Sequence, residues 1–503
     1  MTDGRPSGWD PRRVTNDAPG LDDANVATWP AIYRLRQRLA GSTRVSNRWA
    51  VLVVVLSGLF TVSITITLLA VSLVDIADDL STTPATLSWI ITGPMLAFGV
   101  VGPAAGKAGD LYGHKRLFLV GLAGAGVFAM ATAFAWDAGS LIAFRTLSAT
   151  FGSATGPAAI AMINRLFDSD ERVKALGFWS FVSAGAPVLG VVAGGPLVDA
   201  IGWRIIFLIQ APLCFGGMLV GLLLLPETER GSDRTFDWRG AVCLGGGVTL
   251  LLLALNRGTI WGWTNLAVMA GFVLAPALLA LFVFVERRAV APLMPLEWLR
   301  RRNIVAPIGA QSFANFAYMG GFILMPVLLE KGLGYSTAVV GLFIIARPLA
   351  FALAAPLAGI VTVRVGERVA GVFGAATVGT SMVCLSLIGA GTAGWFIAFA
   401  LALSGIGLGI SSPAMGATVA NAVDEADLGV AGALQQLMTQ VASVVGVTVL
   451  QSVQVGTEAA SGLVGSYGNA FIVAAAVCGA GVACALFIEP THRAELGAVA
   501  AGV

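Results

Sequence analysis

Charge is scarce in this chain. Asp, Glu, Lys and Arg together make up 12% of its 503 residues, whereas soluble globular proteins carry roughly 25%. A larger soluble core cannot account for such a deficit, and the mean hydropathy is +0.84. Most of the chain must therefore face lipid or other buried helices.

Cysteine and histidine are also scarce. The five cysteines all lie in apolar segments and show neither disulfide nor metal spacing. The two histidines, His114 and His492, lie outside those segments. No nucleophile–base pair, metal-ligand cluster or phosphate-binding loop is visible. We therefore expect no enzyme, no metal or cofactor site, and no nucleic-acid partner.

Long apolar runs are abundant instead. About fourteen runs have the roughly 20 residues that a helix needs to cross the hydrocarbon, and none alternates like a β-barrel strand. They lie near 49–73, 86–105, 117–136, 140–163, 174–198, 204–225, 238–256, 264–285, 304–328, 337–361, 369–389, 393–413, 428–452 and 468–488. The first ~45 residues hold no apolar run, so no cleavable signal peptide is expected. The sequence thus predicts an all-α membrane protein.

The positions of lysine and arginine predict the orientation. With the N-terminus inside, the outer loops hold only Arg204, Arg257 and Lys331, and the inner loops hold the other loop cations. Cytoplasmic loops carry an excess of positive charge. We therefore expect a multi-pass protein of the cell (inner) membrane with both termini cytoplasmic.

One short basic loop is strongly patterned. It reads Gly106-Lys-Ala-Gly-Asp-Leu-Tyr-Gly-His-Lys-Arg116, with Asp110 and Gly113 at Gly-x-x-x-Asp-x-x-Gly spacing. A degraded copy, Gly359-Ile-Val-Thr-Val-Arg-Val-Gly-Glu-Arg368, repeats it with Val363 at the acidic position. Both copies are predicted to lie inside, so the two halves run in the same direction. The runs near 238–256 and 264–285 then form an inserted pair between the halves.

The loop resembles the one between spans two and three of major facilitator superfamily transporters. Over roughly residues 49–490 the chain resembles their fourteen-span drug:proton antiporter branch. Arg145 with Pro157 lies where that branch has an Arg-centred motif in span four. Its glycine-rich antiporter motif of span five matches Gly190, Gly194 and Gly195. Trp203-Arg204 and the segment Phe207-Leu-Ile-Gln-Ala-Pro212 are similar to its start of span six.

The resemblance implies the major facilitator fold, with two six-helix bundles, an inserted helix pair and about 14 transmembrane helices. The expected divisions are a cytoplasmic N-terminal tail (1–47), an N-terminal bundle (48–226), the inserted pair with its linkers (227–302), a C-terminal bundle (303–490) and a cytoplasmic tail (491–503).

The resemblance also implies a conformational role for the basic loop from Gly106 to Arg116. In the family this loop meets a neighbouring helix end and latches the two halves in the outward-open state. The implied latch residues are Gly106, Asp110, Gly113, Lys115 and Arg116. The alternative is a simple positive-inside anchor, for which the lysine and arginine alone would suffice.

One departure from the branch concerns proton coupling. The branch usually places an Asp in span one, where this chain has Thr65. No Asp or Glu falls at mid-span in the predicted topology, and Asp75, Asp78 and Asp79 cluster at the outer end of span one. A proton carrier inside a membrane is usually a buried Asp, Glu or His. The usual coupling group is therefore not visible.

Two cations remain inside the predicted spans, Arg145 and Arg347. Each costs roughly 2.5–3.5 kcal/mol to insert, so each is expected to face a cavity or a partner. For Arg145 the resemblance implies a part in coupling and structure, and the alternative is a structural arginine bonded to backbone carbonyls. For Arg347 we weigh an anion-attracting group in the substrate cavity against a side chain that snorkels or pairs with a helix C-terminus.

Polar residues in the predicted spans are candidates for the substrate cavity. Gln311, Asn315 and Tyr318 form an i, i+4, i+7 stripe on a helix that lines the cavity in the family. Such a stripe could instead hydrogen-bond a neighbouring helix. Further candidates are Gln435, Gln436 and Gln440, which could also bridge helices, and Trp89, which could belong to the interfacial aromatic belt.

Three functions are compatible with these features. The first is an exporter of amphipathic small molecules, of the multidrug type, that works by alternating access. The second keeps the fold but moves lipid-like or anionic amphiphiles without the usual carboxylate, because Arg145 and Arg347 are present and the acid is not. The third is a non-transporting sensor that retains the fold. The expected partners are the substrate and membrane lipids, and a monomer suffices.

Overall fold

The computed structural model describes residues 48–71, 76–77, 79–82, 84–87, 89–226, 237–289, 292–424 and 427–489. In these ranges the chain is helical between turns and contains no strand. Each predicted apolar run overlaps a helix, and ten of the described helices are long and apolar enough to cross a membrane. The predicted tails at 1–47 and 491–503, and also Asp75 and Asp78, lie outside the described residues.

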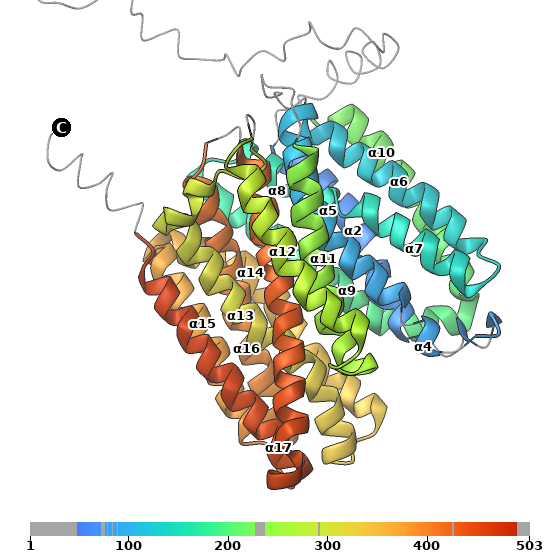
Figure 1. Cartoon of the computed structure of the whole chain (residues 1–503), viewed down its shortest axis with the longest axis vertical. Helices are drawn as coiled ribbons and strands as arrows, with labels where there is room; N and C mark the ends of the chain where they lie inside the picture. The colour runs from blue at the N-terminus through green and yellow to red at the C-terminus, as the bar shows by residue number, and fades with distance from the viewer. Residues whose placement is uncertain are drawn as a thin grey trace, which may run out of the picture.

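A first group of helices packs together on one side of the molecule (Figure 1). In this group α2 packs on α9, α6 on α10 and α7, and α5 on α7. Its core includes the fully enclosed Phe118, Leu122 and Phe207. The bounds are α2 Arg48–Val71, α4 Pro84–Leu87, α5 Trp89–Tyr112, α6 His114–Ala133, α7 Ala138–Gly152, α8 Thr155–Leu166, α9 Ser169–Ile201 and α10 Trp203–Leu224.

The apolar run near 140–163 differs from the prediction, since it forms two helices rather than one. The break falls at Ser153 and Ala154, between α7 and α8. Pro157 explains it, because proline has no N–H to donate to the carbonyl four residues earlier, which is that of Ser153.

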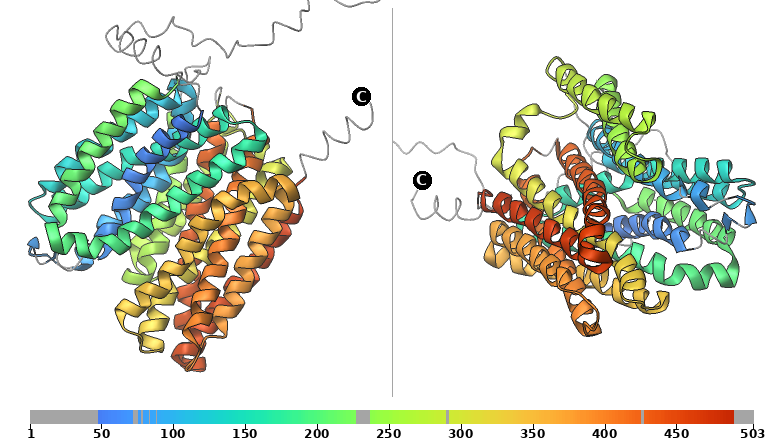
Figure 2. Two further views of the ribbon diagram at one scale, coloured as in Figure 1. Left: turned by 180° about the vertical axis from the view of Figure 1, so that it is seen from behind. Right: turned by 60° about the horizontal axis from the view of Figure 1, so that its bottom comes forward.

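The inserted pair consists of α11 (Trp238–Trp261) and α12 (Leu266–Glu286). A tight turn at Gly262, with φ of 90°, joins the two helices. α11 packs on α12, on α5 of the first group and on α17 of the last group. The pair therefore lies across one face of the molecule, where both groups meet (Figure 2).

A second group of helices completes the molecule. α13 packs on α17, α14 on α16, and α15 on both α16 and α17. The bounds are a 3-10 turn η3 Leu296–Arg300, α13 Arg302–Val327, a π-helical turn η4 Leu328–Gly332, α14 Thr337–Val365, α15 Glu367–Ser386, α16 Gly394–Asn421 and α17 Leu428–Leu486. The predicted runs 428–452 and 468–488 fall in two helices that share the label α17, because the chain kinks at Gly462, with φ of 70°.

The sequence repeat has a structural counterpart. Gly113, between α5 and α6, has φ of 97°, and the matched Gly366, between α14 and α15, has φ of 86°. Both positions are in the left-handed region that favours glycine. The two groups meet where α9 packs on α14 and where α5 and α8 pack on α17. Figure 1 shows their ribbons converging toward the top and diverging toward the bottom.

Candidate functional site

Asp110, near the C-terminal end of α5, binds the beginning of α17. Its Oδ1 accepts a hydrogen bond from the backbone N–H of Gly429 at 3.2 Å, and its Oδ2 accepts one from Val430 at 3.1 Å. The side chain is buried. The first N–H groups of a helix have no partner within it, and its dipole attracts negative charge there. A carboxylate from the first group thus caps a helix of the second.

Two cationic or polar side chains complete this contact. Nε2 of His114 lies 2.8 Å from Oδ1 of Asp110. An ionised carboxylate only accepts, so His114 donates from Nε2. Arg165, from α8, approaches the same oxygen at 3.6 Å. The carboxylate of Asp110 is therefore contacted by His114, by Arg165 and by the backbone N–H groups of α17.

Two glycines allow α5 and α17 to meet at this point. A Cβ on Gly106 would stand 2.5 Å from the carbonyl oxygen of Gly429, and a Cβ on Gly429 would stand 2.7 Å from the carbonyl oxygen of Gly106. Real Cβ atoms do not come that close to backbone. Of the other predicted latch residues, Gly113 makes the turn into α6, Lys115 is buried and Arg116 is exposed. We call the Asp110–Gly429–Val430 contact, with Gly106, the latch.

A second crossing holds the same end of the molecule together. A Cβ on Gly177 of α9 would stand 2.5 Å from a carbonyl oxygen of α14, and one on Gly359 would stand 2.7 Å from a Cα of α9. Arg172 of α9 donates to the side chain of Asn421 on α16. Gly359 is the repeat partner of Gly106, so matched glycines serve both crossings. This end, where the ribbons converge in Figure 1, is called the latch end.

Thr65, at the place of the usual acid, belongs to a hydrogen-bonded network of an amide, a hydroxyl and a guanidinium. Its hydroxyl accepts from Nε2 of Gln210 on α10 at 3.0 Å. Its carbonyl accepts from Nη2 of Arg145 on α7 at 3.2 Å, and the Arg145 guanidinium lies 5.2 Å from the ring centre of Phe207. Arg145 is buried and forms no ion pair within the described residues. This geometry is that of an arginine bonded to a backbone carbonyl.

Arg347 lies inside the second group of helices, with an exposed fraction of 0%. Its Nε donates to the hydroxyl of Ser404 on α16, and its Nη1 donates to the carbonyl of Tyr318 on α13, both at 2.7 Å. The guanidinium also stands 4.7 Å from the centre of the Tyr318 ring. Arg347 therefore ties α14 to α13 and α16.

This setting predicts that Arg347 contributes strongly to stability. In Arg347→Met the hydroxyl and the carbonyl would lose buried, charge-assisted partners, so we expect a loss of about 2 kcal/mol or more. The measurement is the unfolding temperature of the purified protein in detergent. Arg368→Met, at an exposed position of the same group, is the control. Equal unfolding temperatures for both variants would contradict this assignment.

A polar cavity of about 230 Å³ lies in the seam between the two groups. Four of its lining residues each hold a buried side-chain atom without a hydrogen-bond partner within the described part of the chain: Nε1 of Trp179, Oγ of Ser180, and Oε1 of Gln311 and of Gln436. None of its described lining residues is charged. The lining comes from α8, α9, α13, α16 and α17: Ile160, Leu176, Trp179, Ser180, Gln311, Ser412, Pro413, Gly416, Gly432, Gln435, Gln436, Thr439 and Gln440.

The predicted cavity residues divide between this cavity and other places. Gln311 and Gln436 line it, whereas the side chain of Asn315 donates back to the carbonyl of Gln311 at 3.0 Å, and Tyr318 faces Arg347. The ring centre of Trp89 lies 3.9 Å from Cζ of Arg257, which is on α11.

The α9 residues Trp179 and Ser180 were not predicted as cavity residues. A tryptophan beside a serine within an apolar run was the available signal. In the predicted antiporter motif on the same helix, Gly190 is buried, and the surroundings of Gly194 and Gly195 lie outside the described residues.

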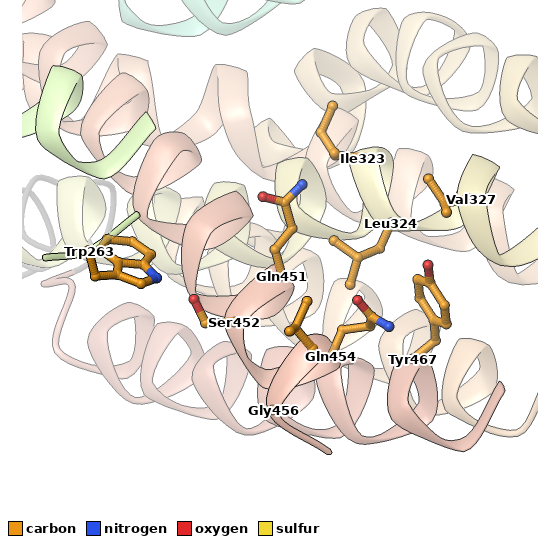
Figure 3. A pocket seen from close by; sticks show the side chains of 10 residues that line it. Trp263, Ile323, Leu324, Val327, Gln451, Ser452, Gln454, Gly456 and Tyr467 are labelled. Carbon is orange, nitrogen blue, oxygen red and sulfur yellow. The ribbon is translucent and has the colours of Figure 1, made fainter. Parts of the chain in front are cut away.

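A second pocket, of about 590 Å³, is lined by residues of α13, α17 and the turn before α12 (Figure 3). Trp263, in the turn before α12, stands on one side of it, and Val327 and Tyr467 stand on the other. Its polar groups are partly occupied, because Nε2 of Gln454 donates to Ser466 at 3.2 Å and to Glu458 at 3.0 Å. We call it the outer pocket.

Two helical groups that meet along a seam, with a cavity in the seam and a helix-capping contact across one end, define a two-bundle membrane transport fold. The chain belongs to the Major Facilitator Superfamily, whose family profile matches residues 55–447 and, overlapping them, 309–501. It is therefore a multi-pass membrane protein of a transporter family.

Several relatives are resistance and export proteins. The chain is 31% identical over 411 residues to the tetracenomycin C resistance and export protein of Streptomyces glaucescens, covering 80% of this chain and 75% of that one. It is 30% identical over 423 residues to the puromycin resistance protein pur8 of Streptomyces alboniger, covering 82% and 83%. These relatives support a membrane efflux transporter.

Solved structures share the fold at low identity. The human organic anion transporter MFSD10 superposes with a TM-score of 0.61 at 15% identity, over 86% of this chain and 98% of that one. The proton:xylose symporter XylE superposes with a TM-score of 0.63 at 14% identity, over 88% and 96%. Both likenesses concern the fold alone.

Proposed function

We propose that this protein exports uncharged, amphipathic small molecules from the cytoplasm by alternating access. The observation that carries the proposal is the seam cavity, whose described lining combines glutamine, serine and threonine side chains with apolar ones and includes no charged residue. Such a lining suits a ligand that is mostly apolar and carries a few hydrogen-bonding groups. The named resistance and export relatives support the direction of transport.

In this proposal the protein lies in the cell (inner) membrane with about fourteen spans and both termini in the cytoplasm. The two groups of helices act as the N-terminal bundle (48–226) and the C-terminal bundle (303–490), with 227–302 as the inserted pair and its linkers. The latch end then faces the cytoplasm. The state described is the one with the cytoplasmic side closed.

The cavity argues for neutral cargo over anionic or lipid-like cargo. Arg145 and Arg347, which suggested an anionic substrate, do not line it. A volume of about 230 Å³ holds only part of a drug-sized molecule. We infer that the polar groups recognise one portion of the substrate, while the rest extends along the seam.

Transport by the purified protein in liposomes tests this function. Neutral, cationic and anionic fluorescent amphiphiles of similar size would be compared, each with and without an imposed pH gradient. We expect transport of the neutral probe and a weak response to the gradient, because Thr65 replaces the usual carboxylate. Transport of the anionic probe alone would favour the second function, and no transport of any probe would favour a sensor.

Removing single polar groups from the cavity should weaken transport. Gln311→Leu and Gln436→Leu each delete the polar amide of a cavity-lining residue, so we expect an approximately 10-fold loss in kcat/KM for the neutral substrate. Gln451→Leu changes the same residue type in the outer pocket and is the matched control. Equal kinetics for all three variants would move the binding site away from this cavity.

A further inference from the structure

Two carboxyl groups that belong to neither the latch nor the cavity lie where α11 begins and α12 ends. We call this end of the helix pair its foot. Asp237 immediately precedes α11, and Glu286, which is 4% exposed, ends α12. Oδ1 of Asp237 accepts from the backbone N–H of Gly240 at 2.9 Å, and Oε1 of Glu286 accepts from that of Met294. The second oxygen of each, Oδ2 and Oε2, is buried without a hydrogen-bond partner in the described part of the chain.

These two unpartnered oxygens face the same small space. A Cβ on Gly240 would stand 2.4 Å from Oδ2 of Asp237 and 3.0 Å from Oε2 of Glu286. Only the absence of a side chain at Gly240 leaves this space open. Glu286 is buried and Asp237 is half-buried. Two carboxylates whose oxygens face one enclosed space repel each other, so the pair is stable when one of them keeps a proton.

One lysine of the first group of helices acts electrostatically on Glu286. The charged residues that act on Glu286 across space are Asp237 and Lys107, which is on α5 beside Gly106 of the latch. Lys107 can balance one carboxylate but not two. Arg239, Arg287 and Arg288 are near in sequence, but they are exposed, and water and salt screen their charge.

We propose that Asp237 and Glu286 are a proton-binding site, with one proton held between Oδ2 of Asp237 and Oε2 of Glu286, and that this proton stabilises the latched state. The site is separate from the proposed substrate cavity. It supplies a titratable group to a protein that lacks the usual acid in its first span.

Contacts connect this site to the latch. Met294, whose N–H binds Glu286, belongs to an apolar cluster with Cys243, Phe282 and Val430. The backbone N–H of Val430 is one of the two donors to Asp110. A movement of the foot therefore displaces a residue of the latch.

The sign of the pH dependence follows from the burial of the pair. In the latched state a second negative charge has no partner, whereas an opened foot would let water solvate both carboxylates. The latched state is thus favoured at low pH on the latch side and is lost as the pH rises and the proton leaves to water.

Infrared titration of the full-length protein in liposomes tests the site directly, without a transport assay. We expect the wild type to show the infrared band of one protonated, buried carboxyl group, and this band should disappear as the pH rises. The band should be absent in Asp237→Asn and in Glu286→Gln. Glu297→Gln, at an exposed acid near the foot, should keep it. A signal that survives in both pair variants would overturn the proposal. Because no substrate is involved, this result is independent of the export function.

The coupling to the latch has its own readout. Spin labels at Tyr112 and Val365, exposed and repeat-related positions at the ends of α5 and α14, report the opening of the latch end. Labels on unnatural amino acids leave the native cysteines in place. In the wild type the short distance between the two labels should become less populated as the pH rises. In Asp237→Asn and in Glu286→Gln the distance distribution should not change with pH.

Asp427 is the competing explanation for such a response. Burial raises the pKa of Asp427, Asp110 acts in the same direction, and Lys107 opposes them. If Asp427→Asn abolished the pH response while Glu286→Gln and Asp237→Asn retained it, the titrating group would be Asp427 and the proposal would be wrong.

Discussion

Asp110→Asn is expected to open the latch end of the protein, which faces the cytoplasm in the proposed orientation. The change removes the charge that two backbone N–H groups of α17 and the side chains of His114 and Arg165 all approach. Charge-assisted hydrogen bonds are worth roughly 1.5–3 kcal/mol each, and asparagine keeps one accepting oxygen. We estimate a net loss of about 2 kcal/mol, or about 30-fold in the ratio of latched to open protein.

Thiol reactivity measures this shift. A cysteine at Ser412, in the wall of the seam cavity, should react slowly with a membrane-impermeant reagent added from the cytoplasmic side, and much faster in Asp110→Asn. Asp137→Asn is the matched control, because Asp137 also caps a helix but does so within the first group, at α7. Equal reactivity in the wild type and in Asp110→Asn would show that the acid does not hold this end closed.

Gly429→Ala should have an effect at least as large, through shape rather than charge. The added Cβ would stand 2.5 Å from Cε1 of His114 and 2.7 Å from both Oδ1 of Asp110 and the carbonyl oxygen of Gly106. The backbone oxygen cannot move without moving α5, so the two helices must separate. Each group keeps its own core, and the protein should still fold.

Gly479→Ala is the control for this substitution, because it changes a glycine of α17 beyond the kink at Gly462, where a Cβ would meet nothing within 4 Å. We expect Ser412 reactivity from the cytoplasmic side to rise in Gly429→Ala and to stay at the wild-type level in Gly479→Ala. Gly106→Ala should reproduce the effect from the other side of the contact. If Gly429→Ala instead kept substrate transport and thiol protection intact, the close approach of α5 and α17 would not matter for the latch.

The broad fold could be predicted from the sequence because membrane-spanning helices have a simple sequence pattern. Each needs about 20 apolar residues, and each predicted run overlaps a described helix. The breaks were harder to predict. The interruption at Ser153 depends on a hydrogen bond that Pro157 cannot donate, and the first helix of α17 continues past its predicted end at 452 to the kink at Gly462.

Residues of the candidate site could be predicted only where a local sequence pattern within one helix or loop identifies them. Asp110 and Gly106 stand out by spacing, but their partners Gly429 and Val430 are more than three hundred positions away and have no distinctive pattern. Trp179 and Ser180 join the cavity only because α9 crosses the seam. Asp237 and Glu286 come together because α11 and α12 pair antiparallel, a contact that no local pattern records.

The distance between spin labels at Tyr112 and Val365, compared in the wild type and in Asp110→Asn, tests the central claim most directly. If Asp110 holds the cytoplasmic side closed, the wild type will show mainly a short distance at neutral pH, and the variant will gain a longer one. A wild type that is already at the long distance, or a variant with the same distribution as the wild type, would contradict the claim.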